Sequence, residues 1–451
     1  MAKKSKLKFL ACSAALSLAV GFAAVFGGCF STAGRDGING KDLNIYDIYE
    51  AAKTESGNSS LTMEEFLKEY LSYNSSELEE ATSLKAAINR SLMSGVSILA
   101  NFRERENGTY ENKSYFGSGV ILDVDIENGD MVVLTNCHVV YSAKANVQGV
   151  QNGYSNSITC WLYGNEDFET GGGSMGATII AASKTYDAAL LSVKNSDVVK
   201  KSKAVAATWA GGEENYLGET VYAIGNPKGK KLSANVGYIS KDLEKVAVDL
   251  GANNRPEEFE YNVIRSSVDV NSGNSGGGLF NASGELVGLV NSRSADSDMT
   301  GAGYALTGAV IRRVVARMLA EYDGENPVYG VNTLDHGIYL KVSDSYSTGL
   351  NDKGLAELRE DTVVYSVDGL SKSWDKIEIG DQIKNVKIKR VVNGETVTVE
   401  DADILREHNF YDVMLAVAPD DTVEFTIVRD GALLEEPVSV VYSGSDFSLA
   451  L

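Results

Sequence analysis

The chain has 451 residues, enough for two or three domains and a sizeable core. It is 43% hydrophobic and 23% charged, which is an ordinary globular balance. The formal net charge of −21 disfavours nucleic acid as a partner, because its phosphates would be repelled.

Residues 1–28 have the pattern of a secretory signal. A basic head precedes an apolar run from Phe9 to Phe26, and small residues follow as far as Cys29. The residues that end at Cys29 resemble a bacterial lipobox, in which cleavage leaves a lipid-modified cysteine. An uncleaved membrane anchor is the alternative, because the run is about long enough to span a bilayer. Both interpretations place the bulk of the protein outside the cytoplasm, tethered to a membrane face.

Residues 29–92 predict a spacer with short helices. Thr62 and Glu65 form a capping-box pattern at the start of one helix, over residues 61–73. A second helical pattern runs from about residue 76 to residue 93. We expect this spacer to hold the following domain away from the membrane.

Residues 93–325 change to short β-like runs separated by turn residues. Asn128-Gly129, between two such runs, is a strong hairpin signal. Many short strands at this spacing predict a β-barrel or sandwich, and a helix over about residues 309–322 closes the region. The runs are GSGVILDV, MVVLTN, SITCWLYG, GATIIAAS, AALLSVK, ETVYAIG, YNVIRSSVDV and GELVGLVNS.

Residues 330–451 predict a small α+β domain. GIYLKV, DTVVYSV, GDQIKNVKI and VEFTIVRDG have the pattern of strands, and residues 401–416 have that of a helix. No pairing of histidine, cysteine and serine suggests chemistry here.

Cys137 and Cys160 are the two cysteines that remain for the folded part, because Cys12 lies in the apolar run and Cys29 at the cleavage site. They could form a disulfide in an oxidising compartment. Two buried thiols are the alternative, and the sequence leaves both open.

Three separate motifs carry residues of a nucleophilic site. His138 ends an apolar strand in VVLTNCHVV, Asp187 precedes another in KTYDAALLSV, and Ser275 lies in GNSGGG. Singly, a structural histidine, a turn-capping aspartate and a flexible linker would explain them. Their chain order of histidine, aspartate and serine in a β-rich context is that of the chymotrypsin triad.

The glycines around Ser275 could belong to a nucleophile turn or to a flexible linker. A serine hydroxyl needs a base to remove its proton, and the oxyanion formed by its attack needs preorganised N–H donors. Gly273 permits the unusual backbone turn that would present such donors. A flexible linker is not expected between two strand-like runs, so the pattern favours the nucleophile.

TNCHVV, DAALLSV, AIGNP and GNSGG together resemble the HtrA (DegP-like) family of trypsin-fold serine proteases over about residues 95–320. The family implies a chymotrypsin/trypsin-like double β-barrel, with two six-stranded barrels and the active site in the cleft between them. By this resemblance His138 is the general base, Asp187 its orienting carboxylate and Ser275 the nucleophile.

The resemblance also implies an oxyanion hole and a mode of activation. The N–H groups of Gly273 and Ser275 form the hole, with Asn274 at the turn. Digestive relatives carry an aspartate at the position of Asn274, which pairs with a newly cut N-terminus. Asn274 cannot form that ion pair, so we expect activation by loop ordering and not by zymogen cleavage.

Asp269 raises a question of specificity. It lies six residues before Ser275, where trypsin carries the aspartate of its specificity pocket. If Asp269 lines the pocket, lysine or arginine is preferred before the scissile bond. If Arg293 neutralises it, the small aliphatic preference usual in the HtrA family is expected instead.

IEIGDQI followed by VEFTIVRDG resembles the end of a PDZ domain, over about residues 330–445. PDZ domains add a peptide strand to a sheet edge and grip its C-terminus. The resemblance places the carboxylate-gripping loop at Gly337 and Ile338, although the usual pattern is blurred there. A packing or assembly domain is the alternative.

The sequence as a whole predicts an extracytoplasmic, membrane-tethered serine endopeptidase that cleaves unfolded or damaged proteins through an acyl-enzyme. No metal or other cofactor is implied, because no ligand cluster has metal-site spacing. The family further implies a homotrimer. The alternatives are a latent or inactive protease-fold chaperone that senses peptides, and a structural surface protein.

Overall fold

The computed structural model describes Lys53 and residues 84–106, 108–147, 151–211, 217–250, 258–291, 302–351 and 354–450. The predicted signal segment, Cys29, nearly all of the spacer and Arg293 lie outside these residues. Residues 84–92 are helical, within the second helix predicted for the spacer. In the described ranges, no helix combines the length and the apolar character needed to cross a membrane.

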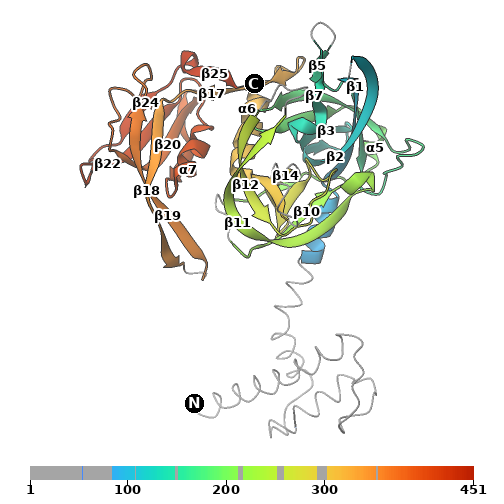
Figure 1. Ribbon diagram of the computed structural model, residues 1–451, viewed down its shortest axis with the longest axis horizontal. Coiled ribbons are helices and arrows are strands. Elements are labelled where there is room, and N and C mark those ends of the chain that lie inside the picture. Colours follow the sequence, from blue (N-terminus) through green and yellow to red (C-terminus); the bar gives the residue numbers. More distant parts are fainter. Residues whose placement is uncertain are drawn as a thin grey trace. The chain divides into compact units, whose positions relative to one another are not determined.

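The first barrel follows directly, and six of its strands close on one another (Figure 1). The order is β6-β1-β2-β3-β8-β7, and β7 pairs with both β8 and β6. Two further strands form the β4–β5 hairpin, and β16 adds to β7. The bounds are β1 Gly95–Glu106, β2 Thr109–Asp125, β3 Asp130–Thr135, β4 Tyr141–Val147, β5 Gln151–Tyr154, β6 Ser157–Leu162, β7 Met175–Ser183, β8 Ala188–Val193 and β16 Val328–Tyr329.

The second barrel has the same plan. Its order is β13-β10-β11-β12-β15-β14, closed by pairing of β13 with β14, and β9 adds to β14. The prediction of two six-stranded barrels is confirmed. The bounds are β9 Thr208–Trp209, β10 Thr220–Gly225, β11 Ser233–Asp249, β12 Glu258–Ser266, β13 Gly278–Asn281, β14 Glu285–Asn291 and β15 Gly303–Thr307.

The β2–β3 hairpin shows how a local signal sets the register. β2 ends at Asp125 and β3 begins at Asp130, with Asn128-Gly129 between them. Gly129 has a φ of +76°, which is strained for other residues, and a Cβ there would lie 2.6 Å from a backbone oxygen of Ser196. The predicted hairpin is therefore confirmed, and only glycine fits its turn.

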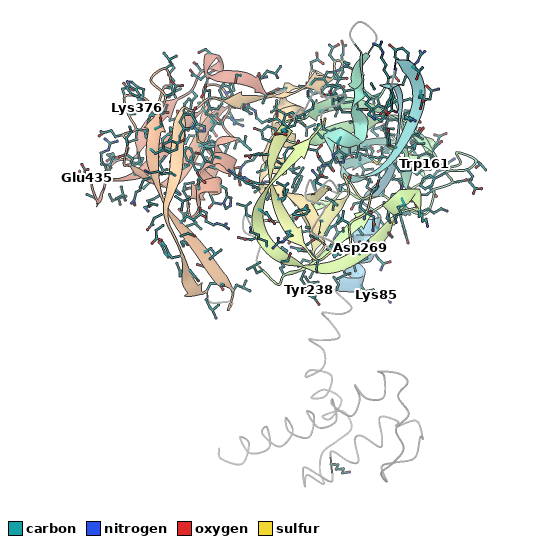
Figure 2. All side chains as sticks on the ribbon, in the orientation of Figure 1. Lys85, Trp161, Tyr238, Asp269, Lys376 and Glu435 are labelled. Carbon is teal, nitrogen blue, oxygen red and sulfur yellow. The ribbon has the colours of Figure 1, made fainter. Side chains whose placement is uncertain are left out.

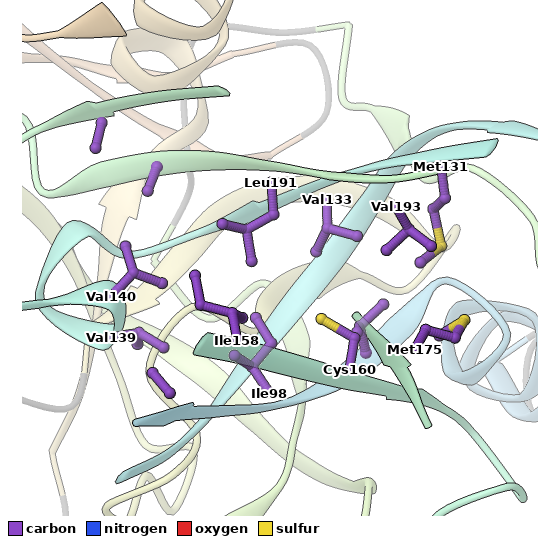
Figure 3. Close-up of a cluster of buried hydrophobic side chains, with 14 of the residues drawn as sticks. Ile98, Met131, Val133, Val139, Val140, Ile158, Cys160, Met175, Leu191 and Val193 are labelled. Carbon is purple, nitrogen blue, oxygen red and sulfur yellow. The ribbon is translucent and has the colours of Figure 1, made fainter. Parts of the chain in front are cut away.

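Two of the hydrophobic cores in the described part of the barrels position the cleft. One fills the first barrel, where Ile98, Val133 and Leu191 pack around Val139 and Val140 (Figure 3). The other joins both barrels to helix α6 (Gly308–Glu321), through buried side chains from all three. Helix α6 matches the helix predicted over residues 309–322. Because one core spans both barrels, the cleft between them has fixed walls.

The C-terminal region is a small α+β domain with its own core. Its largest sheet has β20 paired with β21 and β22, and β22 paired in turn with β23 and β24. The β18–β19 pair and the β17–β25 pair form two separate two-stranded sheets. The bounds are β17 Val331–Leu334, β18 Ile338–Leu350, β19 Ala356–Val367, β20 Gln382–Val392, β21 Glu395–Asp403, α7 Glu407–Met414, β22 Thr422–Arg429, β23 Ala432–Leu433, β24 Val438–Val441 and β25 Phe447–Ala450.

The helix predicted over residues 401–416 is shorter than expected. Residues 401–403 belong to β21, which a turn at Asn393-Gly394 pairs antiparallel with β20. The helix begins only at Glu407, where the N–H of Arg406 donates to Asn409 Oδ1 at 2.9 Å and the N–H of Asn409 donates to the carbonyl of Arg406 at 3.1 Å. Pairing with β20 therefore overrides the helical pattern of the first residues.

Candidate active site

His138 is delivered to the cleft by a single helical turn. β3 ends at Thr135, and α4 (Cys137–Val140) follows immediately. Val139 and Val140 are buried in the core of the first barrel, which fixes the turn from below. The backbone N–H of His138 donates to Asp187 Oδ1 at 3.0 Å. The turn that carries the imidazole is therefore held both by the buried valines and by the hydrogen bond to Asp187.

Asp187 contacts the Nδ1 edge of the His138 imidazole. Its Oδ2 lies 2.8 Å from His138 Nδ1, and the carboxylate is fully buried. Its backbone φ of 44° lies in the left-handed region, which aspartate tolerates better than most residues. The Asn291 side-chain amide donates to the same Oδ2 at 2.9 Å. This arrangement favours the tautomer with the proton on Nδ1 and leaves Nε2 to accept a proton.

Ser275 lies on a turn that side chains would prevent from forming. Gly273 and Gly276 on either side have φ values of +98° and +82°. A Cβ on Gly273 would lie 2.3 Å from the carbonyl oxygen of Asn226, and one on Gly276 would lie 2.2 Å from Thr135 Oγ1. Both the backbone conformation and the close approach of neighbouring atoms therefore require these glycines.

Ser118 clamps this turn against the first barrel. Its hydroxyl donates to the carbonyl of Gly273 at 2.7 Å and accepts from the N–H of Asn226 at 2.8 Å. Its own N–H donates to the carbonyl of Ser275 at 2.8 Å, and its carbonyl accepts from Thr135 Oγ1 at 2.7 Å. One fully buried residue thus fixes the serine turn to the strand end that carries the histidine.

The N–H of Gly273 is oriented by a hydrogen bond on the far side of its peptide. The carbonyl of Ser272 accepts from the N–H of Lys228 at 2.7 Å. Because the peptide is trans, the N–H of Gly273 points in the opposite direction. The N–H of Asn274 donates to the carbonyl of Asn271 at 2.9 Å, and Asn274 is buried beside Gly225. Asn274 therefore shapes the turn through its backbone.

A cavity of about 730 Å³ brings the candidate residues together. His138, Gly273 and Ser275 line it along with Phe116 and Tyr141. The side chain of His138 is 6% exposed, so it opens onto the cavity while its Nδ1 stays on Asp187. The three residues predicted from separate motifs thus meet at one place in the fold.

Asp269 follows strand β12 of the second barrel (Figure 2). Its side chain is exposed and accepts from Asn271 Nδ2 at 3.1 Å, and it does not line the cavity that holds Ser275. The residue that precedes it, Val268, is buried in the core of the second barrel. The specificity role of Asp269 stays a prediction.

Cys137 and Cys160 are both buried in the core of the first barrel, and no disulfide joins them. Burial raises the pKa of the Cys160 thiol to about 12, so it stays protonated and packs as an apolar side chain. Of the two alternatives for this pair, the structure therefore has the thiols.

Gly337 and Ile338 are predicted for peptide binding; Ile338 begins strand β18 of the C-terminal domain, and Gly337 immediately precedes it. Gly337 has a φ of +65°, and Ile338 is fully buried. The N–H of Ile338 donates to Nδ1 of His336 at 3.0 Å. Burial lowers the pKa of His336 to about 4, so this nitrogen remains an acceptor at neutral pH. A peptide role for the loop stays a prediction, as does lipidation of Cys29.

Comparison with known proteins agrees with this geometry. A trypsin-like peptidase domain matches residues 117–289, a range that contains His138, Asp187 and Ser275. Serine protease Do-like HtrA of Bacillus subtilis (strain 168) is 27% identical over 342 residues, covering 71% of this chain and 66% of that protein. The chain is an HtrA-like serine protease of the trypsin fold.

A second relative and a solved structure also match most of this HtrA-like chain. Serine protease Do-like HtrA of Lactococcus lactis subsp. cremoris (strain MG1363) is 26% identical over 341 residues, covering 73% of this chain and 72% of that protein. Among solved structures, the HtrA-type protease AlgW with decapeptide has a TM-score of 0.46 at 18% identity, covering 81% of this chain and 98% of that one.

Two residues of the site were not predicted from the sequence. Asn291 and Ser118 make contacts with residues 104 and 155 positions away in the chain. Asparagine and serine at strand ends are common, so neither carries a signal without its partner. Ser118 stands in GSGV, beside a glycine on each side, and that was the nearest local hint.

Proposed function

We propose that this HtrA-like endopeptidase cleaves unfolded or damaged polypeptides outside the cytoplasm. The observation that carries the proposal is the 2.8 Å contact between His138 Nδ1 and Asp187, in a cavity that Ser275 also lines. The chain spans 66% of the length of the B. subtilis relative, so its substrates and partners are proposals.

The proposed reaction follows an acyl-enzyme route. Ser275 Oγ attacks the scissile carbonyl while His138 Nε2 takes its proton, and Asp187 stabilises the imidazolium. The N–H groups of Gly273 and Ser275 stabilise the oxyanion. His138 returns the proton to the leaving amine, and water then repeats the sequence on the acyl-enzyme. Both products are released with Ser275 regenerated.

The proposal extends to the regions that flank the barrels. The N-terminal pattern supports export and tethering, with Cys29 as a lipid-modified cysteine or residues 1–28 as an anchor. We assign residues 29–92 as a spacer, residues 93–325 as the protease and residues 330–451 as a PDZ-like domain. That domain would take peptide C-termini at Gly337 and Ile338, and the assembly would be a homotrimer.

Casein digestion by the full-length chain tests the activity. Purified protein is incubated with casein beside a Ser275→Ala variant, and cut sites are mapped by mass spectrometry. Cuts that vanish in the variant support the proposal, and the residue before each cut decides the role of Asp269. A folded chain that neither cuts casein nor reacts at Ser275 with a serine-directed phosphonate contradicts it. Labelling without cuts would indicate a latent protease.

A further inference from the structure

Glu104 is a buried acid on the wall of the active-site cavity. It lies on β1, its relative exposure is 2%, and it lines the same cavity as His138 and Ser275. Acidic side chains are rarely buried unless a cation pairs with them. The position of Glu104 in the cleft therefore calls for an explanation that the triad does not supply.

Two hydroxyl groups hold the carboxylate of Glu104. Ser142 Oγ donates to Oε1 at 2.6 Å, and Tyr115 Oη donates to Oε2 at 3.2 Å. Both donors are neutral, so they orient the carboxylate without cancelling its charge. Each oxygen retains acceptor capacity for another donor.

No cation within the described residues forms a salt bridge with Glu104. Lys144 also lines the cavity and its charge interacts with that of Glu104, but its ammonium makes its salt bridge with Glu106 Oε1 at 3.2 Å. Lys228 lines the cavity beside Gly273 and is exposed. A charge that is buried, oriented and without a paired cation favours a positively charged ligand entering the cavity.

The chemistry of the triad indicates which part of a substrate reaches Glu104. His138 hands its proton to the leaving amine, so the segment after the scissile bond departs along the histidine side of the cleft. Val139, Tyr141 and Ser142 follow His138 in the chain and line the cavity with Glu104. An extended chain advances about 3.3 Å per residue, so the first few residues of the leaving segment run along this wall.

We propose that Glu104 selects lysine or arginine among the first three residues that follow the scissile bond. The inference deepens the proposed function and depends on it for the direction of the substrate. It concerns the leaving segment and is separate from the role considered for Asp269, which concerns the residue before the bond. Ser142 and Tyr115 act as positioning residues that aim the carboxylate.

Peptides with one acyl segment and a scanned leaving segment test the proposal. Lysine, glutamine and glutamate are placed in turn at each of the three positions after the cut, and kcat/KM is measured. At one position the wild type should prefer lysine over glutamine by about tenfold, with glutamate poorest, because a charge-assisted contact is gained. The preference should weaken with added salt.

Variants at two neighbouring acids on β1 separate specific from general electrostatics. Glu104→Gln keeps acceptor and size but loses the charge, so the lysine preference should disappear. Glu104→Asp keeps the charge and should retain a preference of the same sign. Glu106→Gln removes a half-exposed acid of the same strand outside the cavity and frees its partner Lys144, which lines the cavity, so this variant should weaken the lysine preference through a competing cation without abolishing it. An unchanged preference in Glu104→Gln, or none in the wild type, overturns the proposal.

Binding to Ser275→Ala distinguishes this proposal from the proposed activity. Fluorescence anisotropy with each of the three lysine peptides and its glutamine counterpart does not require turnover. Tighter binding of the lysine peptide in one pair, lost when Glu104→Gln is added, supports the selectivity even if the wild type cuts nothing. Equal binding within all three pairs overturns it. The same thermal midpoint in all variants shows that folding is unaffected.

Discussion

Buried acids have different partners in the protease cleft and in the C-terminal domain. In the C-terminal domain, Asp381 receives Arg429 through two bonds of 2.8 and 2.7 Å. Asp421 receives Arg390 through bonds of 2.9 and 2.7 Å. Both aspartates are 1% exposed. Such bidentate pairs neutralise the acid and join separate segments of the domain.

The acids of the cleft have no arginine. Asp187 is held by an imidazole and an amide, and Glu104 by two hydroxyls. These donors orient a carboxylate but leave its charge available to a proton-accepting ring or to a ligand. Among these four acids, the two with arginine partners stabilise the fold, whereas the two with neutral donors contact the catalytic histidine or line its cavity.

The largest effects are expected from the cleft. Ser275→Ala and His138→Ala should each lower kcat by about 10⁶-fold, and the double variant should be little worse, because the triad acts as a unit. Turnover of a peptide substrate is the measurement, with circular dichroism to verify folding. Additive losses in the double variant would contradict the assignment.

Asp187→Asn should lower kcat by about 10⁴-fold. The amide no longer selects the tautomer with a proton on Nδ1, so His138 is misaligned as a base. Steady-state kinetics and urea unfolding should show a chain that stays folded yet barely turns over. A variant that unfolds while retaining its kcat would place Asp187 with the structural acids.

Asp381→Asn should have the reverse signature. Loss of the charge leaves Arg429, 24% exposed, with a weaker partner, and the free energy of unfolding should fall by about 2 kcal/mol. Cleavage of a short peptide by the folded enzyme should be unchanged. A large fall in kcat without loss of stability would show that Asp381 behaves like the acids of the cleft, which contradicts the comparison.

Ser118→Ala should lower kcat by about tenfold with little change in KM, because the Gly273 carbonyl and the turn beside it lose their clamp. Some stability is lost too, since the N–H of Asn226 is left without its acceptor. Ser94→Ala removes another buried hydroxyl, which donates to the carbonyl of Ser91. That control should lose stability alone, and an equal fall in kcat would remove the special role of Ser118.

The smallest effect concerns acid stability of the C-terminal domain. Burial lowers the pKa of both His336 and His408 to about 4, from about 6.5 when unfolded. The unfolded chain therefore binds more protons between these values, and stability falls as pH drops through this window. At pH 5.5 each histidine should cost about 1 kcal/mol.

Hydrogen exchange at pH 7.5 and 5.5 measures this loss of stability. On lowering the pH, amide protection should fall more in residues 331–450 than in the barrels. His408→Gln should reduce the pH dependence of the unfolding free energy by up to one proton. An unaltered dependence would mean that His408 is not neutral when folded. His408→Gln should leave cleavage of a short peptide unchanged at pH 7.5, because the residue is in the C-terminal domain.

The sequence by itself determined the parts of this protein that local chemistry specifies. Short β-like runs and the Asn128-Gly129 turn predicted a β-barrel or sandwich, which the family resemblance narrowed to two barrels. His138, Asp187 and Ser275 each stood in a recognisable local motif. The glycines around Ser275 could be interpreted because a positive φ is a property of one residue. Such signals need no knowledge of what lies across the fold.

Only the tertiary structure decided the contacts between distant segments. Ser118, Asn291 and Glu104 are ordinary polar residues in the sequence, and their roles come from partners that folding brings within hydrogen-bond reach. The same reason explains the shortened helix at residues 401–403, where pairing with β20 overrode a helical pattern. Hydrogen bonds and burial are short-ranged in space and indifferent to chain separation, so a linear pattern cannot express them.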